Sequence, residues 1–375
     1  MAEVRLDGVT KRYGKNEAVS EMSWTANPGE LVVLFGPAGA GKTTTLKMIA
    51  GLEPLDGGDI YFDSQSLREV DTADRNVAMA FENYALYPHL TVYENIAFPL
   101  MVPGKKNQFS KEEISRRISE IAAVLQIEML LKRMPQELSG GQRQRVALGR
   151  CLVREPAVTL LDEPIAHLDA KLRHRMYAEL KRIQRQRGTT TIYATPAQTE
   201  AMAMADRIVV IFNGKVQQIG TPRELYERPV SVNVAKFGGE QTMNIMPAKL
   251  ITEGGSLRFL LAGNHLPMQN NVEADLKASQ VGQDIIIGVR PPDMTCSLAP
   301  IEGGFPAEVY AVEHSGRHPL VTLKLGEQLI EVISGVLSSG VQVGTPIWLS
   351  LANCRLYVFD AVTSQLVVTS NGQPA

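Results

Sequence analysis

The sequence predicts an α/β domain followed by a smaller all-β domain. Its 375 residues are enough for about two domains of ordinary size. In the first part of the chain, short apolar runs of strand length alternate with segments of helical periodicity, as in a sheet covered by helices. After Pro229 the sequence changes to short alternating segments separated by glycine and proline, which is typical of small barrels. We place the boundary between residues 235 and 236.

In the first domain, the apolar run Leu31–Phe35 has the length of a buried strand, and a glycine-rich turn follows it. A helix is predicted over Lys42–Ala50 and is ended by Gly51. Asn213–Gly214 separates two strand-like runs and predicts a hairpin that closes this domain near residue 220. Further strands are predicted at Asp59–Phe62, Val77–Phe81, Val158–Leu161, Thr190–Ala194 and Arg207–Phe212.

Residues 88–155 form a helical insertion between these strands. Ser110 and Glu113 have the spacing of a capping box, and the apolar residues that follow repeat at helical spacing. In residues 236–375 the pattern favours strands of a small OB-like barrel. Those strands are predicted at Ile285–Val289, Ala307–Val312, Leu320–Leu325, Ile347–Leu351 and Leu356–Phe359.

Composition excludes several classes of function. Hydrophobic residues make up 44% and charged residues 21%, which is the composition of an ordinary globular protein. A net charge of −2 gives no overall attraction to nucleic acid, so nucleic acid is not an expected partner. Three scattered cysteines without CxxC spacing indicate core thiols. Neither a secretory signal nor an apolar run of about 18 residues is present, so another chain would supply any membrane span.

The turn after Leu31–Phe35 fits the pattern G-x-x-x-x-G-K-[ST], which binds phosphates. Its glycines let backbone N–H groups surround a β-phosphate, and the helix that follows points its positive end at the same oxygens. Lys42 adds a charge for the β- and γ-phosphates, and Thr43 offers a hydroxyl to Mg²⁺. The candidate ATP-binding residues of this loop are Gly36, Pro37, Ala38, Gly39, Ala40, Gly41, Lys42, Thr43 and Thr44.

Asp162 and Glu163 follow the apolar run Val158–Leu161, so a buried strand would deliver both carboxylates to the sheet edge where ligands bind. Asp162 suits a contact to Mg²⁺ through water. Glu163 suits the general base that polarises an attacking water. Together with the phosphate loop, these residues predict a nucleoside triphosphatase.

The segment Leu138–Gln142 (LSGGQ) precedes a helical run and presents a serine, two glycines and a helix N-terminus to an anion. With the phosphate loop and the LLDEP run, the segment Leu138–Arg150 resembles the ATP-binding subunits of ABC transporters. The resemblance implies a P-loop ATPase fold with antiparallel β and helical subdomains. It also implies two subunits joined head to tail, with each ATP between the phosphate loop of one chain and Ser139, Gly140, Gly141 and Gln142 of the other.

The resemblance continues along the chain and is closest to the maltose-importer type of ATPase (MalK-like). Tyr13 matches the aromatic residue that stacks on adenine, and Asn83–Phe98 resembles the segment that grips two membrane-spanning permease subunits. Ile287–Pro291 (IGVRP) matches a regulatory, TOBE-type β domain that strengthens dimerisation. The likeness implies a peripheral protein at the cytoplasmic face of the cell membrane. An extracytoplasmic solute-binding protein would be an indirect partner. The transported solute would be a sugar or a sugar-like compound.

Three departures from the family pattern lie where the γ-phosphate and its water are handled. Pro196 and Ala197 stand where the family has a switch histidine followed by aspartate, and proline offers neither a side-chain donor nor an N–H. Glu82 replaces a glutamine: it can still ligate Mg²⁺, but it adds negative charge beside the other carboxylates. The loop after Glu163 reads Ala166–Asp169 (AHLD) instead of the usual SNLD.

Two accounts of these departures remain open, beside ordinary hydrolysis by an imperfect homodimer. In the first, the chain pairs with a different ATPase, and its own site binds ATP but hydrolyses it slowly. In the second, it is a homodimer in which His167 reaches across the dimer to replace the histidine missing at Pro196. Other functions considered are a soluble ABC-type switch in translation or DNA repair, and an ATP-binding protein whose β domain mainly regulates another protein.

Overall fold

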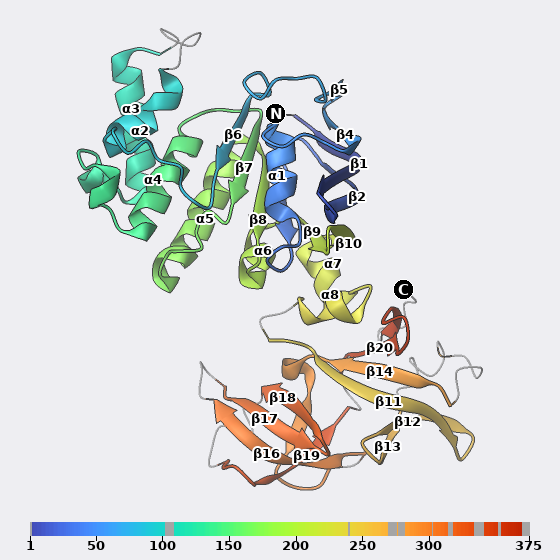
Figure 1. Cartoon of the computed structure of the whole chain (residues 1–375). Coiled ribbons are helices and arrows are strands. Elements are labelled where there is room, and N and C mark those ends of the chain that lie inside the picture. The colour runs from blue at the N-terminus through green and yellow to red at the C-terminus, as the bar shows by residue number, and fades with distance from the viewer. Residues whose placement is uncertain are drawn as a thin grey trace. The chain divides into compact units, whose positions relative to one another are not determined.

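The computed structural model describes residues 2–101, 109–238, 241–268, 276, 282–301, 303–313, 318–333, 341–351 and 354–369. The chain folds as two compact units, Met1–Pro222 and Arg223–Ala375 (Figure 1). The short helices α7 (Pro222–Glu227) and α8 (Val232–Lys236) lie at the start of the second unit. This division after Pro222 falls earlier than the domain boundary that the sequence predicts between residues 235 and 236. The predicted boundary between the ATP-binding and regulatory domains stays a prediction.

A six-stranded sheet forms the core of the first unit, in the order β10-β9-β3-β8-β7-β6. All neighbouring strands run parallel except β10, which pairs with β9 through the predicted hairpin, where Asn213 and Gly214 both have positive φ. The strands are β3 (Leu31–Phe35), β6 (Val77–Ala80), β7 (Val158–Asp162), β8 (Thr190–Thr195), β9 (Arg207–Phe212) and β10 (Lys215–Gly220). The apolar runs in this sheet are confirmed as strands, and β3, β7 and β8 are wholly buried.

A second sheet of the first unit is antiparallel, in the order β2-β1-β4-β5. Its strands are β1 (Val4–Tyr13), β2 (Asn16–Ala26), β4 (Gly57–Phe62) and β5 (Gln65–Ser66). The predicted strand Asp59–Phe62 therefore belongs to this sheet and not to the parallel one. Its partner is β1, which lies about fifty residues earlier in the chain, so its sequence alone does not reveal which sheet it joins.

Helix α1 (Lys42–Ala50) follows the phosphate loop and ends at Gly51, as predicted. Helices α2, α3 and α4 gather on the side of the central sheet away from β1 and β2 (Figure 1). Their bounds, with those of the remaining helices of the unit, are α2 (Val92–Ala97), α3 (Lys111–Leu125), α4 (Gly140–Leu152), α5 (Ala170–Arg187) and α6 (Gln198–Met204). Short 3₁₀ turns occur at Phe98–Leu100, Glu128–Leu130 and Pro135–Glu137. Among the helices that the structure describes, none combines the length and the apolar character needed to cross a membrane.

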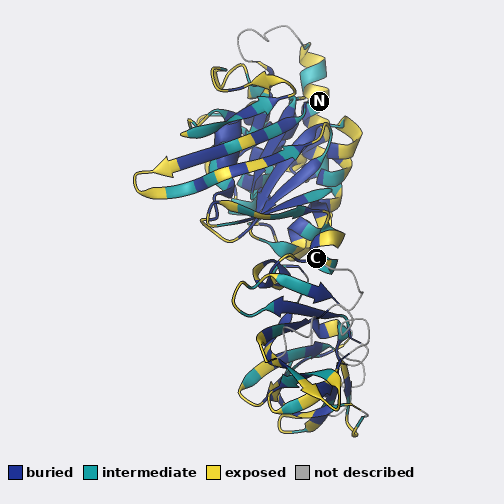
Figure 2. Ribbon diagram, turned by 90° about the vertical axis from the view of Figure 1, so that its right-hand side faces the viewer, coloured by how far each residue is buried: buried dark blue, intermediate teal, exposed yellow. Residues whose placement is uncertain are grey.

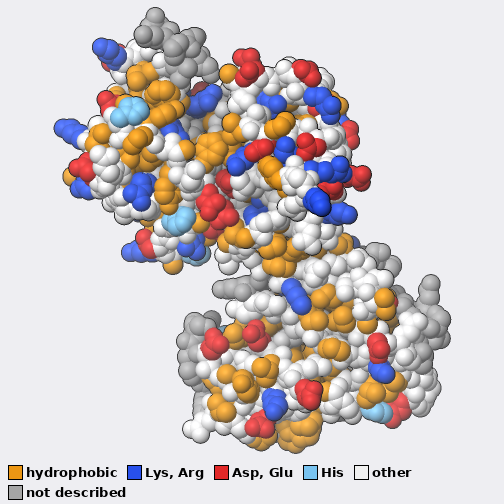
Figure 3. Space-filling model, in the orientation of Figure 1, with side chains coloured by type: hydrophobic (Ala, Val, Ile, Leu, Met, Phe, Trp, Pro, Cys, Tyr) orange, Lys and Arg blue, Asp and Glu red, His pale blue; other side chains and the backbone are white. Residues whose placement is uncertain are grey.

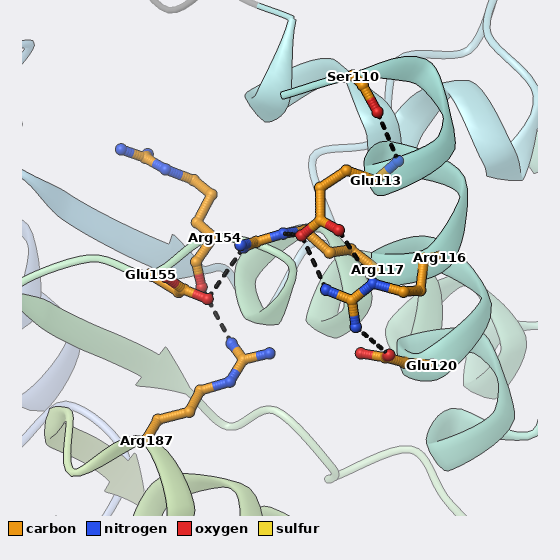
Figure 4. Close-up of polar contacts among 8 residues, drawn as sticks. All are labelled: Ser110, Glu113, Arg116, Arg117, Glu120, Arg154, Glu155 and Arg187. Carbon is orange, nitrogen blue, oxygen red and sulfur yellow. Dashed lines mark hydrogen bonds and ion pairs between the residues drawn. The ribbon is translucent and has the colours of Figure 1, made fainter. Parts of the chain in front are cut away.

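Helix α3 begins at the predicted cap, but only half of the expected capping box forms. The Oγ of Ser110 accepts from the N–H of Glu113 at 3.2 Å. The carboxylate of Glu113 instead accepts from Arg116 at 2.8 Å and from Arg117 at 2.7 Å (Figure 4). Hydrogen bonds from Arg116 and then Arg117 lower the pKa of Glu113 to about 2. Arg117 also binds Glu155 at 2.9 Å, which ties α3 to the segment before β7.

The described residues of the second unit form strands and short helical turns, among them a 3₁₀ turn at Pro291–Asp293. Its strands form two antiparallel sheets, β13-β12-β11-β14-β20-β21 and β15-β19-β16-β17-β18, whose apolar faces share one core (Figure 2). The strands are β11 (Asn244–Glu253), β12 (Ser256–Leu261), β13 (Asn264–Pro267), β14 (Asp284–Val289), β15 (Thr295–Ser297), β16 (Phe305–Glu313), β17 (Leu320–Leu325), β18 (Gln328–Ile333), β19 (Pro346–Ser350), β20 (Leu356–Asp360) and β21 (Leu366–Thr369). The five predicted strands are confirmed as β14, β16, β17, β19 and β20.

Side chains of the two charges are interspersed on the face of the first unit that Figure 3 shows, in keeping with the net charge of −2. The three cysteines, Cys151, Cys296 and Cys354, are buried thiols outside any disulfide. This confirms that they are core thiols. Burial raises the pKa of the Cys151 thiol to about 12.

Candidate nucleotide-binding and catalytic site

The sequence-predicted residues meet at one edge of the parallel sheet. Strands β3, β8, β7 and β6 are consecutive neighbours and parallel, so their carboxyl ends lie side by side. The phosphate loop follows β3, Pro196 follows β8, Asp162 and Glu163 lie at the end of β7, and Glu82 follows β6. This edge is where open α/β sheets bind ligands.

Two glycines of the phosphate loop are required by their surroundings. A Cβ on Gly36 would lie 2.1 Å from the carbonyl oxygen of Ile211. Gly41 has φ +102, and a Cβ there would lie 2.5 Å from the carbonyl oxygen of Ala18. Any side chain at these positions would displace the backbone of the loop. The loop therefore forms a close-fitting backbone cradle, which is the form that phosphate binding needs.

Lys42 is the cation of this cradle. Its side chain is buried, and its Nζ donates to the carbonyl oxygens of Gly36 at 2.8 Å and Pro37 at 2.9 Å. Burial lowers the pKa of Lys42, while the negative charges of Glu163, Asp162 and Glu82 act in the opposite direction. A partly desolvated ammonium held by neutral carbonyls is poised to exchange them for phosphate oxygens.

Thr43 and Asp162 form the pair expected of a magnesium site. The hydroxyl of Thr43 donates to Oδ1 of Asp162 at 3.0 Å, which joins the first turn of α1 to the end of β7. The pKa of Asp162 is raised, mainly by burial. The hydrogen bond from Thr43 acts in the opposite direction, and the charge of Glu82 raises the pKa further. Hydroxyl and carboxylate oxygens are the ligands that Mg²⁺ takes, alongside phosphates and waters. In the described parts of the chain, no group of three His, Cys, Asp or Glu side chains is arranged to hold a metal ion.

Glu163 follows β7 in a constrained backbone conformation. Its φ is +45°, in the left-handed region that residues with a side chain rarely adopt. Its N–H donates to the carbonyl oxygen of Ala194 at 3.0 Å, and its own carbonyl oxygen accepts from Nε2 of Gln144 at 2.9 Å. Burial and then the charge of Glu82 raise the pKa of the Glu163 carboxyl. A raised pKa brings a carboxylate closer to the range in which it works as a general base.

The departures from the family pattern lie in this same site. Glu82 is exposed, and its charge acts on Lys42, Asp162 and Glu163, so it lies among them as expected. Pro196 is exposed directly after β8. The next N–H along the chain, that of Ala197, already donates to Oγ1 of Thr195 at 3.0 Å. The N–H of Ala197 is therefore not available to replace the missing histidine donor.

His167 is exposed on the loop after Glu163. Its ring meets the ring of Tyr84 edge to face, with 5.8 Å between centroids, and its N–H donates to Oε1 of Gln144 at 3.1 Å. Within one chain, His167 therefore contacts the loop after β6. The idea that it reaches a partner's nucleotide stays a prediction.

The LSGGQ segment forms the predicted helix N-terminus. Ser139 caps α4 through a reciprocal capping box: its Oγ accepts from the N–H of Gln142 at 3.3 Å, and Oε1 of Gln142 accepts from the N–H of Ser139 at 2.9 Å. Ser139 is exposed, and Gly140 and Gly141 are partly so. The first N–H groups of α4 can thus face an anion outside the chain.

Tyr13 ends β1 with 46% of its surface exposed. Burial and the charge of Glu53 raise its pKa, and a hydrogen bond with Thr44 acts in the opposite direction, which places the phenol beside the phosphate loop. Nζ of Lys11 lies 5.3 Å from the ring centroid. Tyr13 is thus a partly exposed ring beside the phosphate loop, and its stacking on adenine stays a prediction.

Sequence reasoning missed Gln144, which contacts both Glu163 and the following loop. The available signal was its spacing: Gln144 shares the buried face of α4 with Leu148 and Cys151, four and seven residues later. A glutamine on an apolar helix face must have its amide hydrogen bonds satisfied from a neighbouring segment.

This fold and site define a P-loop ATPase with a helical subdomain and an ABC-type signature segment. A sequence model of the ABC transporter family matches residues 19–166. The chain is 44% identical to the trehalose/maltose import ATP-binding protein MalK of Thermococcus litoralis, over 98% of this chain and all of that protein. It is 40% identical to the sn-glycerol-3-phosphate import ATP-binding protein UgpC of Escherichia coli K12, again over 98% of this chain and all of that one.

Solved structures agree with these relatives. Two dimeric structures of a bacterial ABC transporter cassette, one of them in a post-hydrolysis state with ADP and phosphate, match with TM-scores of 0.55 and 0.54. Both are 30% identical and cover 58% of this chain and 98% of the other. The chain belongs to the ABC transporter family, among the ATP-binding subunits of importers. Such subunits are ATPases coupled to import, dimerise, and work with membrane permease subunits.

Proposed function

We propose that this chain is the ATP-binding, energy-coupling subunit of an importer for sugars or sugar-like solutes, and that its own ATP site hydrolyses slowly. The proposal of slow hydrolysis rests on the turn at Pro196. It combines a residue without a donor and a neighbouring N–H that is already used by Thr195. A contact to the γ-phosphate that strengthens in the transition state is therefore missing, and such contacts supply much of the rate of phosphoryl transfer.

The remaining parts of the site support binding of Mg-ATP. Lys42 and the backbone of the loop would hold the β- and γ-phosphates, Thr44 in the first turn of α1 would add a further phosphate contact, and Tyr13 would stack on adenine. Thr43 and Asp162 would hold Mg²⁺, with Glu82 as a further oxygen ligand, and the ion would neutralise charge on the phosphates. Glu163 orients and deprotonates water.

We assign Ser139, Gly140, Gly141 and Gln142 to the ATP of a second ATPase subunit. A different chain is favoured over a second copy of this one, because a slow site is useful beside a fast one that this intact LSGGQ segment completes. Two permease subunits would bind the loop after β6 and the helical region, where Phe98 and Met101 are exposed. The protein would sit at the cytoplasmic face of the cell membrane. The solute class is carried over from the sugar-type relatives.

The test is to purify the chain and measure binding of Mg-ATP by calorimetry and phosphate release from radiolabelled ATP. The Lys42→Ala and Glu163→Gln variants serve as references for lost binding and lost chemistry. We expect wild-type protein to bind Mg-ATP and to hydrolyse it at a rate close to that of Glu163→Gln. Robust turnover by the isolated chain would contradict the proposal that its own site hydrolyses slowly. Failure to bind Mg-ATP would contradict the proposed ATP-binding role itself.

A further inference from the structure

Gln144 joins the signature helix to the loop that carries the general base. Its side chain is only 3% exposed, and both ends of its amide are used. Nε2 donates to the carbonyl oxygen of Glu163 at 2.9 Å, and Oε1 accepts from the N–H of His167 at 3.1 Å. Because the donor faces a carbonyl and the acceptor faces an N–H, the orientation of the amide is fixed by its partners.

The backbone that Gln144 holds is in an unusual conformation. Glu163 has φ +45°, which costs energy for any residue with a side chain and persists only when neighbouring contacts hold it. One such contact is the bond from the Glu163 N–H to Ala194 on β8. The bond from Gln144 to the Glu163 carbonyl restrains the other side of the same residue. Losing it would let the peptide after Glu163 rotate, and the carboxylate would move with it.

The same helix is packed directly against this loop at its first turn. A Cβ on Gly141 would lie 3.1 Å from the carbonyl oxygen of His167 and 3.3 Å from Cδ2 of Leu168. Gly141 and Gln144 are three residues apart and so lie on one side of α4. The start of α4 and residues 163–168 therefore form one packed assembly, and a shift of the helix is passed to the loop.

We propose that Gln144 is a positioning residue for Glu163, and that it couples the orientation of this carboxylate to the helix whose first turn faces the opposite nucleotide. The inference rests on the proposed function, because it takes Glu163 as the base and Ser139–Gln142 as the segment that contacts the partner's ATP. Docking of α4 on the nucleotide of the opposite site then also sets the base in its own site. Through the side chain of Gln144, closure of one nucleotide site would thus affect the position of the base in the other site.

The experiment uses the full-length chain with three substitutions. Gln144→Leu removes both hydrogen bonds at similar volume. Gln144→Glu keeps an acceptor for the His167 N–H but loses the donor to the Glu163 carbonyl. Gln184→Leu is the matched control, because Gln184 is also buried and its Nε2 donates to two backbone carbonyls, of Gly29 at 2.7 Å and Thr189 at 3.1 Å, away from the site.

Single-turnover hydrolysis of radiolabelled ATP is measured in wild type and in the Glu82→Gln, Pro196→His chain, and the faster of the two is the reference. We expect Gln144→Leu and Gln144→Glu to slow hydrolysis by about tenfold or more, with ATP affinity unchanged, since misplacing a catalytic group costs rate and not binding. Gln184→Leu should keep the reference rate. In a Glu163→Gln background, Gln144→Leu should cause no further loss, because it acts through that carboxylate.

Amide hydrogen exchange gives a second readout that does not depend on turnover. The His167 amide should exchange faster in Gln144→Leu and stay protected in Gln144→Glu, although both hydrolyse slowly. An equal loss of rate in Gln184→Leu, or a normal rate in Gln144→Leu while Glu163→Gln is slow, would overturn the inference and leave the proposed function intact. A normal rate in Glu163→Gln would overturn the base assignment and the inference together.

Discussion

Restoring the family residues at the γ-phosphate should recover hydrolysis in two steps. The changes are Pro196→His, which supplies the missing donor, and Glu82→Gln, which removes a carboxylate from beside Asp162 and Glu163. Both positions are exposed at the sheet edge, so neither change disturbs the apolar core. Only the chemistry of the site is altered.

The size of the effect follows from the kind of contact that is missing. Removing a single donor to charge that develops in a transition state costs about 10²–10³-fold in rate, or about 3–4 kcal/mol. Since the N–H of Ala197 is held by Thr195, it does not compensate for the missing histidine. We expect Pro196→His alone to recover about tenfold, because the charge of Glu82 still opposes the charge that accumulates on the phosphates. Adding Glu82→Gln should recover most of the remainder.

The assay is single-turnover hydrolysis of Mg-ATP by wild type, both single variants and the double variant, with ATP affinity measured in parallel. Affinity should change little, because the lost contact acts mainly in the transition state. Full recovery from Pro196→His alone would show that Glu82 is harmless. No recovery in the double variant would refute the account of why the site is slow.

Three further outcomes follow from the structure. Gly36→Ala should lower the free energy of unfolding by about 1–3 kcal/mol and Gly39→Ala by about 1 kcal/mol, because only the first Cβ meets a backbone oxygen, while Gly39 has open space and only a positive φ of 77°. Equal losses of stability in thermal denaturation would contradict this. Asp162→Asn should raise the Tm of the nucleotide-free protein at neutral pH, because burial raises the pKa of Asp162 and its ionised form therefore destabilises the fold. That gain should shrink as the pH falls through the folded-state pKa, and a gain that grows on acidification would show the sign to be wrong. Native protein should resist thiol labelling at pH 8, since Cys151 is buried with its pKa raised to about 12, whereas all three thiols should react after unfolding; rapid native labelling would show that the thiols are accessible.

The nucleotide site was predictable because its residues follow buried strands. Runs such as Leu31–Phe35 and Val158–Leu161 are apolar throughout, and the residues after them must reach the carboxyl edge of the sheet. The bond between Thr43 and Asp162 then joins two motifs that lie far apart in the sequence. Local pattern and chemistry were therefore enough to predict that these residues lie together at this edge, while their roles stay predictions.

Other features depend on partners that no local pattern reveals. The segment Asp59–Phe62 joins an antiparallel sheet because it pairs with β1, and strand pairing of that kind is decided by tertiary packing. The capping box at Ser110 is incomplete because Arg116 and Arg117 compete for the carboxylate of Glu113. The contact of Gln144 with the Glu163 loop likewise exists only once α4 has packed.

The central claim is that this chain works in an asymmetric pair, in which it completes a partner's active site while its own site is slow. Mass spectrometry of the intact importer complex, isolated from membranes through this chain, tests the claim most directly. The account predicts one copy of this chain together with one different ATPase chain and two permease subunits. A complex that contains two copies of this chain, and no other ATPase, would contradict it.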